Sequence, residues 1–185
     1  MKKRDILNLS IVFLLVNFIF LSGCVNEENL PKENEENVNG SVIYLIYSSF
    51  CPHCHYMMSY LEDMHDKYPS ISVVKIEDGS EYAKYLEDHY GYKWDGGVPL
   101  LFGILRNGTL ILIKGYPTDS QEKNGYFMGK EYEKKMCDNM KGEKIYLNNE
   151  YSFCKLPNGV ILGNKYAVNY LLTLCQEQGC VKIPV

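Results

Sequence analysis

The sequence lacks an excess of basic residues. Its 19 lysines and arginines are outnumbered by 23 aspartates and glutamates, so the formal net charge is −4. A protein that binds nucleic acid needs a basic face for the phosphates, and the charge therefore argues against that partner. The chain also lacks internal repeats. Its one long apolar run, Ile6 to Leu21, is shorter than the roughly 20 residues that a membrane-spanning helix needs.

The N-terminus has the pattern of a targeting segment. Basic residues at positions 2–4 precede the apolar run, and Leu21-Ser22-Gly23-Cys24 follows it. This order is typical of a secretory signal, and the last four residues resemble the lipobox of prokaryotic lipoproteins. The resemblance implies a signal peptide over residues 1–23 and lipidation of Cys24. The alternative is an uncleaved anchor helix. Both interpretations place the protein on the extracytoplasmic face of the cell membrane.

Residues 24–40 predict a flexible tether. Positions 25–40 carry five glutamates, several asparagines and almost no large apolar residue. Fully extended, such a segment reaches on the order of 50 Å. We therefore expect residues 41–185 to form a folded domain that the tether holds near the membrane.

The chain has seven cysteines, which is many for a reducing cytosol. Besides Cys24 and a closely spaced pair, Cys51 and Cys54, four remain: Cys137, Cys154, Cys175 and Cys180. An even number of remaining cysteines, in a protein expected outside the cytoplasm, suggests two structural disulfides. Four cysteines allow three connectivities. Among these we favour Cys137–Cys154 with Cys175–Cys180, the alternative being a Cys175 that is simply buried.

The cysteine pair lies at a predicted strand-to-helix junction. An apolar run over residues 42–47 predicts a buried strand, and apolar residues at helical spacing follow Cys54. Cys51 would then lie at the helix N-terminus, where unpaired N–H groups and the helix dipole stabilise a thiolate. Pro52 suits the first helical turn. Cys54, one turn later, faces inward and can close a disulfide. This spacing is typical of a redox motif with Cys51 attacking and Cys54 resolving.

The remaining patterns predict an alternation of strands and helices. Strands are expected at residues 71–76, 100–106 and 109–114, and helices at 80–90 and 164–178. Asn107-Gly108 is a strong hairpin signal between two of the strands. An insertion of residues 116–163 precedes the last helix. Within it we expect a short helix at 131–140 and a hairpin at 151–162.

This order, with Cys-x-x-Cys and a distal Val98-Pro99, resembles the thioredoxin superfamily. The resemblance implies a three-layer α/β/α fold with a mixed four-stranded sheet, here with a cysteine-containing insertion before the last helix. It also implies a cis Val98–Pro99 bond beside the thiols and a substrate-binding role for both residues. Phe50-Cys51-Pro52-His53-Cys54 is similar to the motif of DsbA-type disulfide oxidases. There the histidine stabilises the thiolate, which implies that role for His53.

Two features depart from the DsbA-type pattern. Only about 44 residues separate Cys54 from Pro99, which is the spacing of a thioredoxin and leaves no room for a large helical insertion. The acidic residue that usually lies six positions before the first cysteine is replaced by Leu45. The proton carrier for Cys54 is therefore unassigned, and the oxidase, isomerase and reductase directions all stay open.

These patterns predict a protein thiol-disulfide oxidoreductase that needs no metal or organic cofactor. Its partners would be protein thiols and disulfides, together with a redox partner that recharges the pair. A second interpretation is a c-type cytochrome, because His55 completes a Cys-x-x-Cys-His haem-attachment pattern. A third is a zinc site with Cys175 and Cys180 as further ligands. The last is a binding module in which Cys51–Cys54 is a permanent disulfide.

Overall fold

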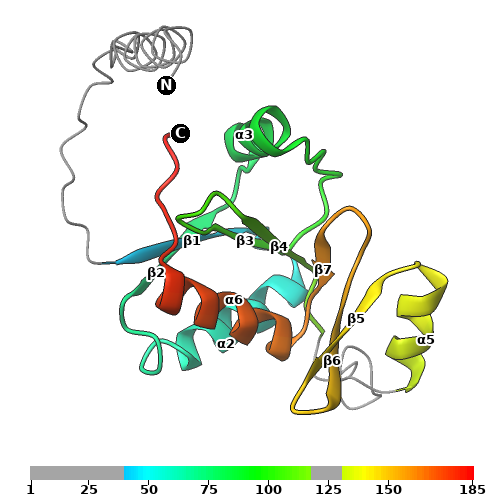
Figure 1. Cartoon of the computed structure of the whole chain (residues 1–185). Helices are drawn as coiled ribbons and strands as arrows, with labels where there is room; N and C mark the ends of the chain where they lie inside the picture. The colour runs from blue at the N-terminus through cyan, green and yellow to red at the C-terminus, as the bar shows by residue number, and fades with distance from the viewer. Residues whose placement is uncertain (1–39, 118–130) are drawn as a thin grey trace, which may run out of the picture. The chain divides into compact units, whose positions relative to one another are not determined.

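The computed structural model describes residues 40–117 and 131–185 (Figure 1). Its strands in chain order are β1 (Ser41–Ile46), β2 (Ile71–Ile76), β3 (Leu100–Ile104), β4 (Leu110–Lys114), β5 (Glu143–Leu147), β6 (Glu150–Lys155) and β7 (Val160–Leu162). Its helices are α2 (Pro52–Asp63), α3 (Ser80–Tyr90), α5 (Glu131–Asn139) and α6 (Lys165–Gln178). The predicted signal peptide, Cys24 and the tether up to residue 39 lie outside the described residues.

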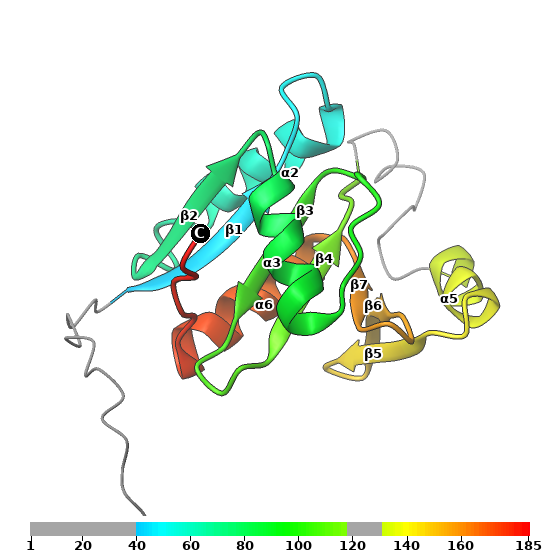
Figure 2. The ribbon, with the colours of Figure 1, turned by 90° about the horizontal axis from the view of Figure 1, so that it is seen from above.

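The first four strands form the core of the predicted fold. Strand β1 pairs in parallel with β2 and antiparallel with β3, which forms a hairpin with β4. Helices α2 and α6 cover one face of these strands and α3 covers the other, as the two perpendicular views show (Figures 1 and 2). The order β-α-β-α-β-β-α and the three layers give a thioredoxin-like α/β fold.

Burial on both faces explains why the central strands are almost uniformly apolar. Side chains alternate along a strand, so Ile43 and Leu45 of β1 pack under α2 and α6, while Tyr44 and Ile46 pack under α3. All four are no more than 2% exposed. A strand covered on both sides needs apolar residues at successive positions, and the run over residues 42–47 meets that need.

The prediction of a four-stranded sheet is wrong, because the structure has seven strands in the order β2-β1-β3-β4-β7-β6-β5. The insertion adds three of them. Strand β7 pairs in parallel with the outer edge of β4, with Ile113 opposite Ile161, and β6 and β5 follow. Phe153 and Ile161 are 1% and 3% exposed and join the apolar cluster beneath α2 and α6. The insertion therefore shares the core instead of depending on a disulfide alone.

Strand β5 was not predicted. Its sequence, Glu-Lys-Ile-Tyr-Leu, has no clean alternation, and a register shift interrupts its pairing with β6 between Ile145 and Tyr146. The strand forms because β6 presents an open edge beside it. The predicted hairpin at 151–162 corresponds to β6 and β7, which turn through Gly159 at a φ of +84°.

The two ends of the insertion meet beside β4. The backbone N–H of Gly163 donates to the carbonyl oxygen of Lys114 at 3.0 Å. The two backbone segments approach so closely that a Cβ on Gly163 would clash with the carbonyl oxygen of Gly115. Only glycine fits at this crossing. Directly after it, Asn164 caps α6, accepting a hydrogen bond from the backbone N–H of Ala167 at 2.8 Å.

Candidate active site

Cys51 is the N-cap residue of α2, and its thiol lies where the helix N–H groups converge. The Cys51 Sγ accepts a hydrogen bond from the backbone N–H of Cys54 at 3.2 Å. Pro52 occupies the first helical position, where its missing N–H leaves no partner unsatisfied. A negative charge on Cys51 Sγ would be stabilised by this N–H and by the positive end of the helix dipole.

Cys54 lies one turn further along α2 and is fully buried, while Cys51 is half-buried. Both are free thiols in this structure. Burial, together with the hydrogen bond to Cys51, raises the pKa of the Cys54 thiol to about 12. Leu45 of β1, six positions before Cys51, is also fully buried. Cys54 is therefore a neutral thiol at physiological pH, and Leu45 offers it no group that accepts a proton.

The Val98–Pro99 peptide bond is cis and lies beside Cys51. The Cys51 thiol donates to the carbonyl oxygen of Val98 across 3.7 Å. On the other side, the carbonyl oxygen of Pro99 accepts the backbone N–H of Gly115 at 2.9 Å. The structure thus brings together Cys51, Cys54 and the proline loop, which the chain separates by more than 40 residues.

Asp95 organises the loop that leads to Pro99. Its Oδ1 accepts the backbone N–H of Gly97 at 3.0 Å, and its Oδ2 forms an ion pair with Lys114 of β4. The hydrogen bond from Lys114 and that from Gly97 hold the pKa of the Asp95 carboxyl below its usual range. The Trp94 indole N–H donates to the carbonyl oxygen of Gly97 at 2.9 Å. The sequence does not reveal this ion pair, because the partner Lys114 lies on another element.

His53 is held by the first residues of the insertion. Its Nδ1 donates a hydrogen to the backbone carbonyl oxygen of Tyr116. Sequence reasoning missed Tyr116, and no signal for it exists, since any residue supplies a backbone carbonyl. The neighbouring His55 points elsewhere: its Nε2 donates to the carbonyl oxygen of Ser49 at 2.9 Å. Phe50 is 93% exposed at the tip of that turn.

The four remaining cysteines form two disulfides in this structure. Cys137 of α5 bonds to Cys154 of β6, and Cys175 of α6 bonds to Cys180. All four are buried. The second disulfide closes the turn after α6, where the hydroxyl of Ser41 bridges the carbonyl oxygen of Cys175 and the backbone N–H of Cys180. Because Cys175 and Cys180 are engaged there, they do not join Cys51 and Cys54 around a zinc ion.

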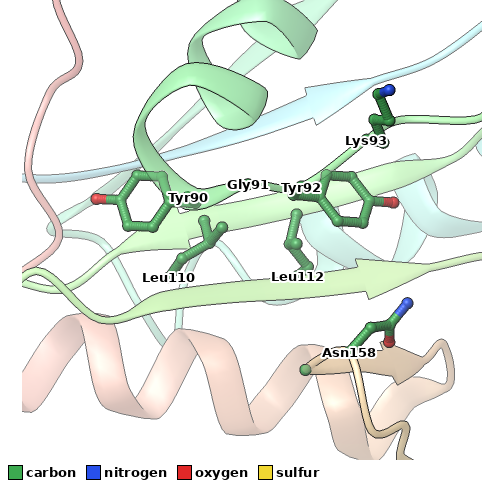
Figure 3. A pocket seen from close by; sticks show the side chains of 8 residues that line it. Tyr90, Gly91, Tyr92, Lys93, Leu110, Leu112 and Asn158 are labelled. Atoms are coloured by element: carbon green, nitrogen blue, oxygen red, sulfur yellow. The ribbon is translucent and has the colours of Figure 1, made fainter.

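A separate cleft of about 510 Å³ lies on the α3 face of the sheet (Figure 3). The segment after α3 and strand β4 form its walls, with Tyr90 and Tyr92 above Leu110 and Leu112, and Asn158 of the β6–β7 turn closes one side. None of the residues predicted for the redox site lines this cleft. Within residues 40–117 and 131–185, no group of three side chains is arranged to hold a metal ion, and no helix is long and apolar enough to cross a membrane.

The fold and the site define a thioredoxin-like α/β protein with a Cys-x-x-Cys pair at a helix N-terminus. Neither the known family models nor the curated proteins give a match to the chain. Among solved structures, it is similar to the oxidised form of mitochondrial thioredoxin 3 from Saccharomyces cerevisiae. The two share 24% identity over 46% of this chain and 76% of that one, with a TM-score of 0.31.

Proposed function

We propose that this chain is a protein thiol-disulfide oxidoreductase that acts through Cys51 and Cys54. One arrangement carries the proposal: an accessible thiol at the helix N-terminus, a buried thiol one turn on, and the Val98 carbonyl within 3.7 Å of the first sulfur. A structural disulfide needs no such asymmetry. Thiol exchange does, because one sulfur must meet the substrate while the other stays shielded.

The chemistry is a pair of sulfur displacements. In the reducing direction, the Cys51 thiolate attacks one sulfur of a substrate disulfide and releases the other as a thiolate. The Cys54 sulfur then attacks Cys51 in the mixed disulfide, forms the Cys51–Cys54 bond and releases the reduced substrate. The oxidising direction is the same path reversed. The direction is set by the relative reduction potentials of the pair and its partners.

The Val98–Pro99 edge fits the role of binding substrate backbone. The carbonyl of Val98 faces Cys51, and the ion pair of Asp95 with Lys114 holds the loop in place. An extended peptide on this edge would place its own sulfur next to Cys51. His53 would assist the thiols from the N-terminal turn of α2, in keeping with the resemblance to DsbA-type motifs.

The proposal also includes the location of the protein. The lipobox-like segment ending at Cys24, and the acidic tether after it, support a lipoprotein on the extracytoplasmic face of the membrane. Two buried disulfides, Cys137–Cys154 and Cys175–Cys180, fit an oxidising compartment. There the pair would act on protein substrates and be recharged by a redox partner, without a metal or organic cofactor.

The test is the equilibrium of the Cys51–Cys54 pair with a glutathione buffer, read by mass after alkylation. A potential near about −120 mV would indicate a disulfide donor, and one near about −270 mV a reductant. Cys51→Ser is expected to abolish exchange, while Cys175→Ser should leave it intact if folding is preserved. If the wild-type pair does not exchange with glutathione or with a protein disulfide, the protein is a binding module and the proposal fails.

The haem interpretation is not favoured by the geometry. A c-type haem is bonded to both cysteines and ligated by the histidine of the motif, yet Cys54 is fully buried on the inner side of α2 and His55 is engaged by the Ser49 carbonyl. Haem attachment would require the first turn of α2 to open. An absorption spectrum of the purified protein without a Soret band would exclude it.

A further inference from the structure

The loop that carries Val98 connects the end of α3 to the start of β3. Two consecutive glycines, Gly96 and Gly97, lie directly before Val98, and the backbone of Gly96 has a φ of +80°. Glycine leaves a backbone free to adopt many conformations. The loop therefore holds the Val98 carbonyl in one place only if other contacts restrict this segment.

The Asp95 carboxylate restricts the segment through both of its oxygens. Its Oδ1 accepts the backbone N–H of Gly97 at 3.0 Å, and its Oδ2 pairs with the ammonium group of Lys114 on β4. One side chain therefore joins the glycine segment to the sheet. The Lys114 side chain passes directly over Gly97, because a Cβ at that position would lie 2.7 Å from Lys114 Cε. The missing side chain of Gly97 thus leaves room for the ion pair.

Lys114 projects from a backbone that is held on both sides. It lies opposite Leu100 of β3 on one side and opposite Leu162 of β7 on the other. Its carbonyl oxygen accepts the backbone N–H of Gly163 at 3.0 Å. Strand β7 and Gly163 belong to the insertion of residues 116–163. The insertion therefore fixes the strand position from which the Lys114 side chain reaches Asp95.

The ion pair is better placed to orient the loop than to stabilise the fold. The side chains of Asp95 and Lys114 are 61% and 33% exposed, and exposed ion pairs contribute little to the free energy of unfolding. Asp95 lies three residues before Val98, whose carbonyl oxygen is 3.7 Å from the Cys51 sulfur. A peptide bound at this edge has to bring its own sulfur to Cys51. A misplacement of about 1 Å can slow such a reaction by on the order of a hundredfold.

We propose that Lys114 is a positioning residue: by holding Asp95 it fixes the Val98 edge, and so selects disulfides that carry an extended peptide backbone over small disulfides that carry none. The proposal rests on the proposed thiol-exchange function and deepens it. A small disulfide needs only the Cys51 sulfur, whereas a polypeptide substrate uses both Cys51 and the Val98 edge. Because β7 fixes the backbone of Lys114, the insertion contributes to this selection.

The test compares two uncharged substrates of the reduced full-length protein. One is hydroxyethyl disulfide, and the other is a disulfide-linked pair of short peptides with blocked ends and no ionisable side chains. In both reactions Cys51 attacks one sulfur and releases the other as a thiolate. The Cys54 sulfur then forms the Cys51–Cys54 bond and releases the second substrate thiol.

The measured quantity is the selectivity of the protein for the peptide. The rate of Cys51–Cys54 bond formation is followed by alkylation and mass spectrometry of the peptide that contains both cysteines. Each second-order rate constant is divided by that of glutathione with the same disulfide, which removes the intrinsic reactivity of the substrate. The ratio of the two corrected constants, peptide over hydroxyethyl disulfide, is the selectivity. It is expected to exceed one in the wild type.

Three variants should lower this selectivity to a similar extent. Lys114→Met keeps an unbranched side chain without the charge, and the selectivity should fall by about tenfold because the edge loses its orientation. Asp95→Asn keeps an oxygen for the N–H of Gly97 and loses the charge, so we expect a similar fall. The double variant should be no worse than either single variant, because both changes remove one and the same ion pair.

The matched control is Lys75→Met, which makes the same change of charge. It removes an exposed ion pair of 2.8 Å between Lys75 of β2 and Glu62 of α2, and its selectivity should equal that of the wild type. Urea unfolding of every variant identifies any that does not fold, and Asp95→Asn decides the question if Lys114→Met is among them.

Several outcomes would overturn the proposal while exchange itself is normal. They are a wild-type selectivity of one or below, an unchanged selectivity in Lys114→Met and Asp95→Asn, and losses that multiply in the double variant. Equal slowing of both substrates would also overturn it, because that result indicates a general effect on Cys51 and not on the edge. A wild-type protein that reacts with neither disulfide would instead refute the proposed function.

Discussion

The asymmetry of the two thiols predicts a large difference in their reactivity. Cys54 is fully buried, and burial raises its pKa from the ordinary value of 9.0 to about 12. At pH 8 its thiolate fraction would be about a thousandfold lower than that of an ordinary cysteine. A thiolate from a weaker acid is more nucleophilic, with a Brønsted coefficient of about 0.4–0.5. The higher nucleophilicity raises the reactivity of the Cys54 thiolate by roughly 15–30-fold. The net suppression is therefore roughly 30–60-fold from ionisation alone.

The assay is timed alkylation with iodoacetamide at pH 8 after mild reduction, with each cysteine quantified by peptide mass spectrometry. Cys51, which is half-buried at the helix end, is expected to react first. Cys54 should react at least 30-fold more slowly than the same cysteine in urea-unfolded protein, and steric burial slows it further. The unfolded sample is the control, because both thiols should react alike in it. Modification of Cys54 within tenfold of its unfolded rate would refute this account of the site.

Three further predictions concern stability and pH. Because the pKa of Cys54 is raised in the folded protein, the unfolded chain releases the thiol proton at a lower pH than the folded chain does. The free energy of unfolding of the reduced wild type, measured with urea, should therefore fall by up to about 4 kcal/mol between pH 9 and 12 relative to that of Cys54→Ala. An equal pH dependence of the wild type and Cys54→Ala would contradict this prediction. Asn164→Ala removes both the cap of α6 and the donor to the buried Ser152 carbonyl. It should lower the free energy of unfolding by about 2–4 kcal/mol in the same assay. A loss below about 1 kcal/mol would show that the cap is dispensable. Because folding lowers the pKa of Asp95, its ion pair with Lys114 stabilises the folded protein at pH values above the pKa of Asp95 in the unfolded chain. This stabilisation disappears as the pH falls, and it is small because the ion pair is exposed. Asp95→Asn should therefore cost only about 0.2–1 kcal/mol at pH 7 and nothing at pH 2, and a constant cost would reject the ion pair as the cause.

Local patterns in the sequence were sufficient for the elements of the core. The run over residues 42–47 corresponds to β1, the helical stripe after Cys54 to α2, and Asn107-Gly108 to the turn between β3 and β4. These predictions rest on short-range periodicity and turn chemistry, which depend on neighbouring residues only. For the same reason the placement of Cys51 at a helix end and of Cys54 on its buried side followed from spacing.

The extent of the sheet was decided by tertiary contacts. The edge of β4 accepts β7 in parallel, with Leu112 opposite Val160, and this pairing joins segments almost 50 residues apart. The apolar residues of β6 and β7 were visible in the sequence, but which strand edge they would extend was not. Periodicity identifies a strand without naming its neighbour, and so the four-stranded prediction failed at the insertion.

Around the thiols, too, some features follow from the sequence and others depend on tertiary contacts. The sequence by itself determined that Cys51 and Cys54 form a pair at a strand-to-helix junction and that an apolar residue, Leu45, lies six positions before Cys51. Only the tertiary structure brought the Val98 carbonyl to Cys51, Lys114 to Asp95 and the Tyr116 carbonyl to His53. Two of these three contacts use backbone carbonyls, which every residue possesses. They leave no trace in residue identity, and only the path of the folded chain decides where they point.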